Sequence, residues 1–179
     1  MNAVTLLGAF PEPPAPALSA IELEVFPLDL VTEWRRCGMI ADFMADYMVH
    51  EFERREAARS ILSTVANELI ENAAKFSADK RAAARVAIRH HGEVVHAELR
   101  NDAAAKHVED LREVLAQLAR EDATGVFRHR LEHRRGLGIA LLARDYGATV
   151  GATATPVETG GMVTVCLRVA LSAVEVEQR

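Results

Sequence analysis

Hydrophobic and polar positions follow two different periods along the chain, and each period predicts one kind of element. Alternation every second residue predicts strands over 21–26, 83–90 and 93–100, and β-rich segments at 148–155 and 162–169 predict two more. A period near 3.6 residues predicts amphipathic helices over about 32–52, 61–77 and 103–120, and an apolar helix from Gly136 to Tyr146. This order predicts an α+β sandwich whose sheet is covered on one face by helices.

Turn-forming residues divide these elements and mark one domain. The turn of a β-hairpin is predicted at His91-Gly92, and a second turn at residues 159–161. Four prolines between Pro11 and Pro16 predict a flexible or extended leader over 1–20, before a domain over 21–179. The chain has 179 residues, of which 50% are hydrophobic, and its composition does not shift, so we expect a single core.

The helix predicted over 61–77 carries polar groups where its apolar face should be. Asn72 falls inside the apolar stripe, and Glu68 and Lys75 fall along its edge. A carboxamide on an inner face needs a hydrogen-bond partner, since leaving it unpaired costs roughly 1–3 kcal/mol. A bound metal ion or phosphate would supply that partner. The alternative is a solvated polar face, with Asn72 bonded to a neighbouring backbone group.

A second candidate site lies at Gly136 and Gly138, which open the later apolar helix. Glycines at such a place let backbone N–H groups approach an anion at the helix N-terminus. The alternative is an ordinary junction between a loop and a helix. The arginines between Arg128 and Arg135 just before it are either a solvated helix end or a source of positive charge for a triphosphate.

The order Glu68-x-x-x-Asn72-x-x-Lys75 resembles the N-box of the GHKL ATP-binding superfamily, which includes gyrase-type ATPases, histidine-kinase catalytic domains and anti-sigma serine kinases. The resemblance implies that Asn72 ligates the magnesium ion on ATP, that Lys75 lies near the phosphates and that Glu68 is the catalytic base. It also implies the Bergerat fold, a two-layer α/β sandwich with a mixed sheet. The later glycine segment resembles the second glycine box, a nucleotide-binding motif of GHKL proteins. This resemblance implies that four consecutive residues contact the nucleotide: Arg135, Gly136, Leu137 and Gly138.

The chain departs from this family between the two motifs. GHKL ATPases carry Asp-x-Gly-x-Gly there, and its aspartate binds the adenine amino group, whereas this chain has Asn101-Asp102-Ala103. Asn101 or Asp102 would then bond adenine, without the glycines that shape the pocket. The Asp-x-Gly-x-Gly sequence is the first glycine box of this superfamily. Small SiaB-type regulators, which are related to the anti-sigma kinases, also combine a complete N-box with a poor first glycine box. Within the superfamily, this chain resembles those regulators more closely.

The resemblance implies an ATP- and Mg²⁺-dependent protein serine/threonine kinase that acts on a small STAS-like partner in bacterial signalling. The rival hypothesis is a non-catalytic GHKL-fold module that sequesters a partner, with degenerate or no ATP binding. A third is ATP hydrolysis coupled to a conformational change, which in gyrase-type relatives needs a transducer domain that supplies a lysine.

Charge and composition limit the other possibilities. A net charge of -5 with a pI near 5.8, and no basic stripe interleaved with aromatics, argue against nucleic-acid binding. No apolar run approaches the roughly 20 residues that span a bilayer, so we expect no membrane association and a cytoplasmic location. The aromatic and methionine stripe of the 32–52 helix, around Trp34, is either core or the face of a homodimer.

Overall fold

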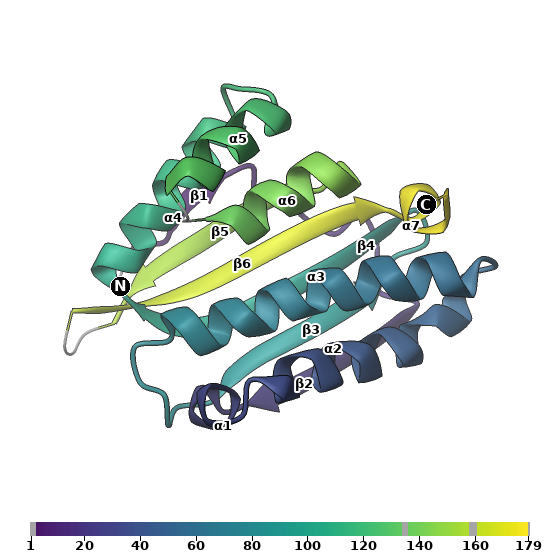
Figure 1. Ribbon diagram of the computed structural model, residues 1–179, viewed down its shortest axis with the longest axis horizontal. Coiled ribbons are helices and arrows are strands. Elements are labelled where there is room, and N and C mark those ends of the chain that lie inside the picture. Colours follow the sequence, from purple (N-terminus) through teal and green to yellow (C-terminus); the bar gives the residue numbers. More distant parts are fainter. Residues whose placement is uncertain (1–2, 134–135, 158–160, 179) are drawn as a thin grey trace.

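Six strands form one sheet, and the main helices lie against one of its faces (Figure 1). The computed structural model describes residues 3–133, 136–157 and 161–178. The strand order is β1-β5-β6-β4-β3-β2, and every pairing between the described strands is antiparallel. The α+β sandwich is therefore confirmed, but the sheet is antiparallel where the family resemblance implied a mixed one. Two of the pairings, β3 with β4 and β5 with β6, are hairpins, which are antiparallel by construction.

The elements have the following bounds. The strands are β1 (Thr5–Gly8), β2 (Ser19–Val25), β3 (Ala84–His90), β4 (Val94–Ala104), β5 (Thr149–Pro156) and β6 (Met162–Ser172). The helices are α1 (Pro27–Thr32), α2 (Arg35–Met48), the short 3-10 helix η1 (Val49–Glu51), α3 (Arg55–Phe76), α4 (Ala105–Leu118), α5 (Ala123–His133), α6 (Leu137–Tyr146) and α7 (Ala173–Gln178).

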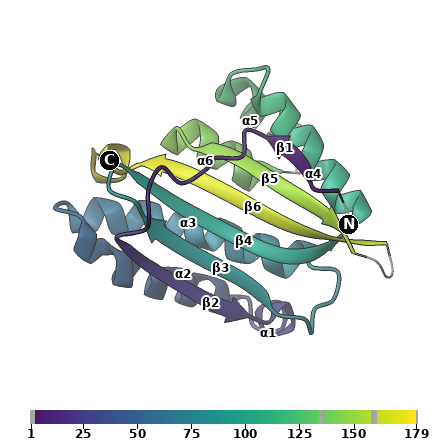
Figure 2. The same ribbon diagram turned by 180° about the vertical axis from the view of Figure 1, so that it is seen from behind.

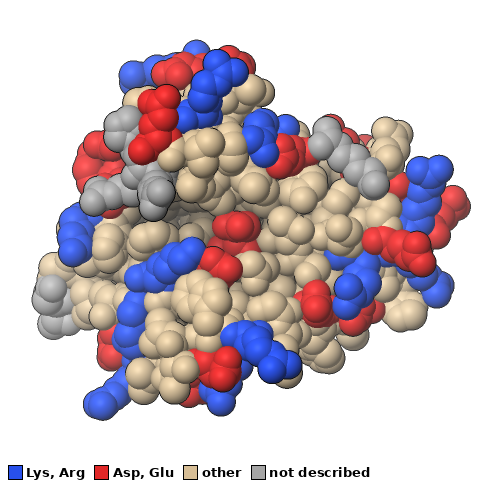
Figure 3. Space-filling model, in the orientation of Figure 1, with Lys and Arg blue, Asp and Glu red and all other residues tan. Residues whose placement is uncertain are grey.

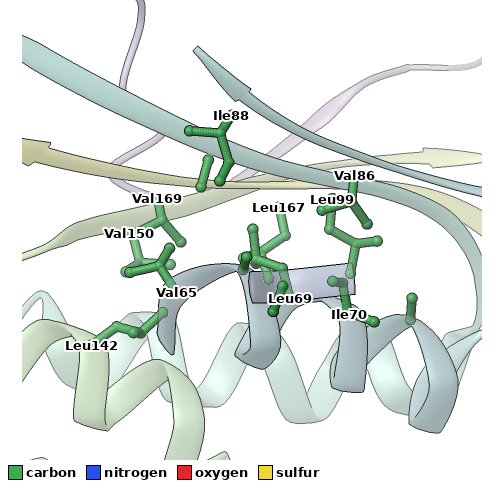
Figure 4. Close-up of a cluster of buried hydrophobic side chains, with 14 of the residues drawn as sticks. Val65, Leu69, Ile70, Val86, Ile88, Leu99, Leu142, Val150, Leu167 and Val169 are labelled. Atoms are coloured by element: carbon green, nitrogen blue, oxygen red, sulfur yellow. The ribbon is translucent and has the colours of Figure 1, made fainter. Parts of the chain in front are cut away.

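The core lies between α3 and the inner face of the sheet. Val65, Leu69 and Ile70 of α3 point toward the strands (Figure 4), and all three are fully buried. Alternate apolar residues of the strands pack against these helix residues, because every second side chain of a strand points to the same face. They are Val86 and Ile88 on β3, Leu99 on β4, Leu167 and Val169 on β6, and Val150 on β5. This packing holds α3 rigidly on the sheet, with its polar residues along one edge of the contact.

The start of the chain joins the sheet instead of forming only the flexible leader that its prolines predict. Residues 5–8 form β1, which pairs with β5. The chain then crosses the face of the sheet opposite the helices before it enters β2 (Figure 2). Arg168 of β6 holds this crossing segment, because Nη1 donates to the carbonyl oxygen of Pro11 at 2.8 Å and the guanidinium lies over the Phe10 ring. A strand of four residues whose partner lies far along the chain leaves little local pattern in the sequence.

The predicted helices over 32–52 and 103–120 are shorter in the structure, and α5 was not predicted. The first begins at Arg35, after a separate α1, and the second begins at Ala105 because β4 continues through Ala104. Of the turn predicted at 159–161, only Gly161 is among the described residues.

The methionine and aromatic residues of α2 lie on two sides of the helix, one buried and one exposed. Met44 and Met48 are fully buried against the core, whereas Met39, Phe43 and Tyr47, spaced four residues apart, are exposed. We call Met39, Phe43 and Tyr47 the α2 apolar band. Phe43 has a relative exposure of 58%, so this side of the helix is available to another molecule.

Candidate functional site

A pocket of about 620 Å³ lies between α3, the inner face of β4 and β6, and the three helices α4, α5 and α6. This volume is in the range of nucleotide and drug-sized sites, roughly 300–1,000 Å³. The space-filling view shows this face hollowed between α3 and the α4–α5 region, with acidic side chains near its middle (Figure 3). Helix α4 lines the pocket through residues such as His107 and Val114.

Helix α3 supplies the polar wall of the pocket. Glu68, Asn72 and Phe76 are spaced four residues apart, so they lie one above another on one face, and all three line the pocket together with Lys75. The Asn72 carboxamide makes no hydrogen bond with any residue that the structure describes. The predicted alternative, in which a neighbouring backbone group satisfies Asn72, is therefore not what the structure has. Phe76, at the end of α3, is 38% exposed at the pocket.

Glu68 lies directly against the start of α6. A Cβ added at Gly138 would be 2.8 Å from Cδ of Glu68 and closer still to Oε2, so only a glycine fits there without moving the carboxylate. Burial raises the pKa of Glu68 above its ordinary value, the neighbouring Glu71 raises it further, and Lys75 partly offsets both. This carboxylate is desolvated and open to the pocket, which suits a proton acceptor.

Lys75 lies at the rim of the pocket. Its Nζ donates to Oε2 of Glu71 at 2.7 Å and stands 5.4 Å from the ring centroid of Trp34. Glu71 also accepts a hydrogen bond from Nδ2 of Asn67, at 3.0 Å. The ammonium is thus held by a carboxylate one helical turn away, and about half of its side chain is exposed.

The apolar helix predicted after Gly136 is α6, and the glycine segment enters it at the pocket wall. Gly136 is the N-cap of α6 with φ of 65°, a left-handed conformation that favours glycine, and an added Cβ would be 2.5 Å from Cγ2 of Val114. Gly136, Leu137 and Gly138 all line the pocket. The N-terminus of this helix therefore opens onto the space beside Glu68, where an anion would be favoured. Arg135 lies outside the described residues.

The two candidates for adenine contact are on opposite faces of the sheet. Asn101 points inward, is nearly buried and lines the pocket, and its Nδ2 donates to Oγ of Ser77 at 2.9 Å. Asp102 points outward and accepts a hydrogen bond from Oγ1 of Thr164. It lines a separate surface hollow with Arg85 and Glu24 instead of the pocket. Side chains on a strand alternate between faces, so two consecutive residues of β4 cannot both contact one ligand.

Two pocket residues were not predicted as site residues. The ring of His107 meets Phe76 edge-on at 5.3 Å between centroids, and its Nδ1 is buried without a hydrogen-bond partner among the described residues. Arg130 of α5 is buried, and its Nε donates to Oε1 of Gln117 at 2.9 Å. The sequence signal for Arg130 is the arginine cluster from Arg128 onward, but nothing in that cluster distinguishes the buried Arg130 from the exposed Arg128.

These features define the class of molecule: an α+β sandwich with a ligand-sized pocket between its central helix and a group of three helices. No protein-family model matches the chain. No curated protein matches it. Among solved structures, it is similar to a chain in the crystal structure of the SiaB–SiaC complex from Pseudomonas aeruginosa, with 19% sequence identity and a TM-score of 0.61.

That similarity covers 87% of this chain and 91% of the other, so it extends over nearly the whole sandwich. It supports the SiaB-like fold implied by the sequence resemblance. At 19% identity it shows the fold alone. Among the described residues, no helix combines the length and the apolar character that crossing a membrane requires.

Proposed function

We propose that this chain is an ATP-dependent protein serine/threonine kinase of the anti-sigma or SiaB type, which acts on a small STAS-like protein. The observation that carries the proposal is the pairing of two groups on one face of α3: the Asn72 carboxamide, which no described residue satisfies, and the desolvated Glu68 carboxylate beside Gly138. The pocket that they line has the volume of a nucleotide site.

The polar wall fits magnesium and triphosphate. Mg²⁺ takes oxygen ligands, and in phosphate-transfer sites it uses one or two protein ligands and completes its shell with phosphate oxygens and water. Oδ1 of Asn72 fits that role, and bound magnesium would neutralise charge on the phosphates. The N-terminus of α6 at Gly136 and Gly138 would face the phosphate oxygens, and Asn101 would contact the base.

In the transfer step, the hydroxyl oxygen of the acceptor serine or threonine would form a bond to the γ-phosphorus. The bond from that phosphorus to the bridging oxygen breaks, and ADP leaves with the electron pair. Glu68 would take the hydroxyl proton. A carboxylate whose pKa is raised by burial is a stronger base than an exposed one, which suits it to this task.

The partner would meet the surface beside the pocket. The α2 apolar band is exposed, and Trp34 at the start of α2 is joined to the pocket rim through Lys75. Exposed apolar side chains grouped on one helix face fit a protein partner. The structurally similar chain was itself crystallised in a complex of two proteins. A homodimer through this band is the second occupant that the same surface would accept.

Nucleotide binding is tested by calorimetric titration of ATP, with and without magnesium, into wild type and Asn72→Ala. The matched control is Asn67→Ala, which also removes a carboxamide from α3. The Asn67 carboxamide donates to Glu71, and Asn67 does not line the pocket. We expect magnesium-dependent binding that Asn72→Ala abolishes and Asn67→Ala retains. Equal ATP affinity of the two variants would show that Asn72 does not take part in nucleotide binding.

The kinase step is tested with Glu68→Gln and a STAS-like protein as acceptor. The variant should bind ATP but transfer no phosphate, because glutamine cannot take the hydroxyl proton. Transfer at the wild-type rate would exclude Glu68 as the base.

The rival function is a binding module without catalysis. Its support is the outward position of Asp102 and the absence of the Asp-x-Gly-x-Gly sequence that shapes the adenine pocket in GHKL ATPases. If wild type binds no ATP at millimolar concentration, this function replaces the kinase.

A further inference from the structure

Arg130 is the most deeply buried charged side chain of the pocket. Its relative exposure is 7%, whereas Arg128 and His129 on the same helix are exposed. Val126, one turn earlier, is fully buried, so Val126 and Arg130 form the inward face of α5. A guanidinium stays protonated in proteins, so this burial places a permanent positive charge at the pocket wall.

The charge of Arg130 has no counter-charge among the described residues. Its one hydrogen bond to them is from Nε to the neutral Gln117, and no described carboxylate forms an ion pair with it. The other arginines with little exposure differ: Nη2 of Arg168 lies 2.7 Å from Glu98, and Nη2 of Arg144 donates to Asp145 at 2.7 Å. Burying an unpaired charge is costly, so such a group normally has a partner.

The side chain of Arg130 lines the pocket. We propose that Arg130 is an anion-binding residue whose two terminal nitrogens hold a phosphate oxygen pair of the ligand, so that the missing counter-charge is the ligand itself. This inference rests on the proposed function, since the phosphate is that of the bound nucleotide. A guanidinium presents parallel N–H groups that match phosphate oxygens in a two-bond arrangement, which a lysine cannot make.

Gln117 orients this group. The bond from Nε uses the donor that points back along the side chain and leaves Nη1 and Nη2 for the pocket. Because Gln117 lies on α4 and Arg130 on α5, the same bond ties these two helices together. A phosphate bound by Arg130 would therefore connect α5 to the polar wall formed by α3.

The test is calorimetry of two ligands, ATP and inorganic triphosphate, at constant excess magnesium. Wild type is compared with Arg130→Gln and with the control Arg128→Gln, which makes the same charge change on the exposed side of α5. A charge-assisted hydrogen bond contributes about 1.5–3 kcal/mol, so we expect Arg130→Gln to weaken both ligands by about tenfold or more. Arg128→Gln should stay within about twofold of wild type.

Arg130→Gln removes the hydrogen bond to Gln117 but no ion pair with a described residue, so we expect the variant to keep its fold. Circular dichroism and melting of Arg130→Gln check this. Equal affinities for the two arginine variants would overturn the proposal.

The two ligands separate this inference from the nucleotide function. Binding of triphosphate but not ATP, lost in Arg130→Gln, supports the anion site and refutes the kinase. Binding of ATP that Arg130→Gln leaves unchanged supports the nucleotide site and refutes the role of Arg130. Wild type that binds neither ligand refutes both.

Discussion

Replacing Gly138 with alanine probes the contact that places Glu68 at the start of α6. The added Cβ would lie 2.8 Å from Cδ of Glu68, whereas carbon atoms normally pack at about 3.5–4.0 Å. Oε2 would be closer still. Because the clash is with the end of a flexible side chain, the carboxylate moves and the helix stays. We therefore expect the substitution to displace Glu68 without unfolding the protein.

Two opposing contributions set the size of the effect. Alanine in place of glycine within a helix stabilises it by about 0.5–1 kcal/mol. Forcing Glu68 away from its preferred rotamer costs about 0.5–1.5 kcal/mol. In the wild-type background the two nearly cancel. In a Glu68→Ala background only the first remains, so Gly138→Ala should then stabilise the protein. The coupling energy between the two positions is therefore about 1 kcal/mol.

The assay is urea denaturation of wild type, both single variants and the double variant. A control cycle pairs Gly138→Ala with Glu71→Ala, which removes a carboxylate of the same helix that points at Lys75 instead of Gly138. That cycle should be additive. Additivity within about 0.3–0.5 kcal/mol in the Glu68 cycle as well would refute the contact, because independent positions behave in this way.

Three further results follow from burial. Leu69→Ala should lower the free energy of unfolding by about 2–5 kcal/mol in urea denaturation, because Leu69 is fully buried against the sheet, while Leu131→Ala, at 55% exposure, should change it by less than about 0.5 kcal/mol. Burial raises the folded-state pKa of Glu68, so as the pH rises this carboxyl group ionises in the unfolded chain before it ionises in the folded protein. Ionisation stabilises the unfolded chain and so lowers the free energy of unfolding of wild type. Glu68→Gln should therefore melt above wild type at pH 7, with a smaller difference at pH 3.5, and a constant difference would contradict this. Gly151→Val should free the segment 9–18 from the sheet, since an added Cβ would lie 2.5 Å from the Ala9 carbonyl carbon, and faster amide exchange confined to that segment would show it.

The parts of the fold that could be predicted are those with a long local pattern. Helix α3 has 22 residues and a continuous apolar stripe, so its periodicity identified it. The hairpin of β3 and β4 follows from alternation around Gly92, where φ is 85°. Strand β1 and helix α5 were missed, because β1 has only four residues and the inward face of α5 includes an arginine.

The site residues that could be predicted are likewise those that lie close together on one element. Glu68, Asn72 and Lys75 lie on one helix, so their spacing alone predicts that they share a wall. Asn101 and Asp102 were both candidates because they stand where GHKL ATPases carry the aspartate that binds adenine, and the strand before them was predicted to end at Arg100. Strand β4 in fact continues through Ala104, and the alternation of its side chains then separates the two residues.

The two walls of the pocket are held by unequal amounts of core. Helix α3 has nine buried residues among 22, whereas α4 has three among 14. Regions with few buried contacts open at lower free energy, so the α4 wall is the less firmly held one. Asn72 is on the firm wall, and Arg130 is bonded to Gln117 of the weaker wall. Loss of Asn72 therefore removes a fixed ligand-binding group, whereas loss of Arg130 also removes the connection through which a bound phosphate would stabilise α4 and α5.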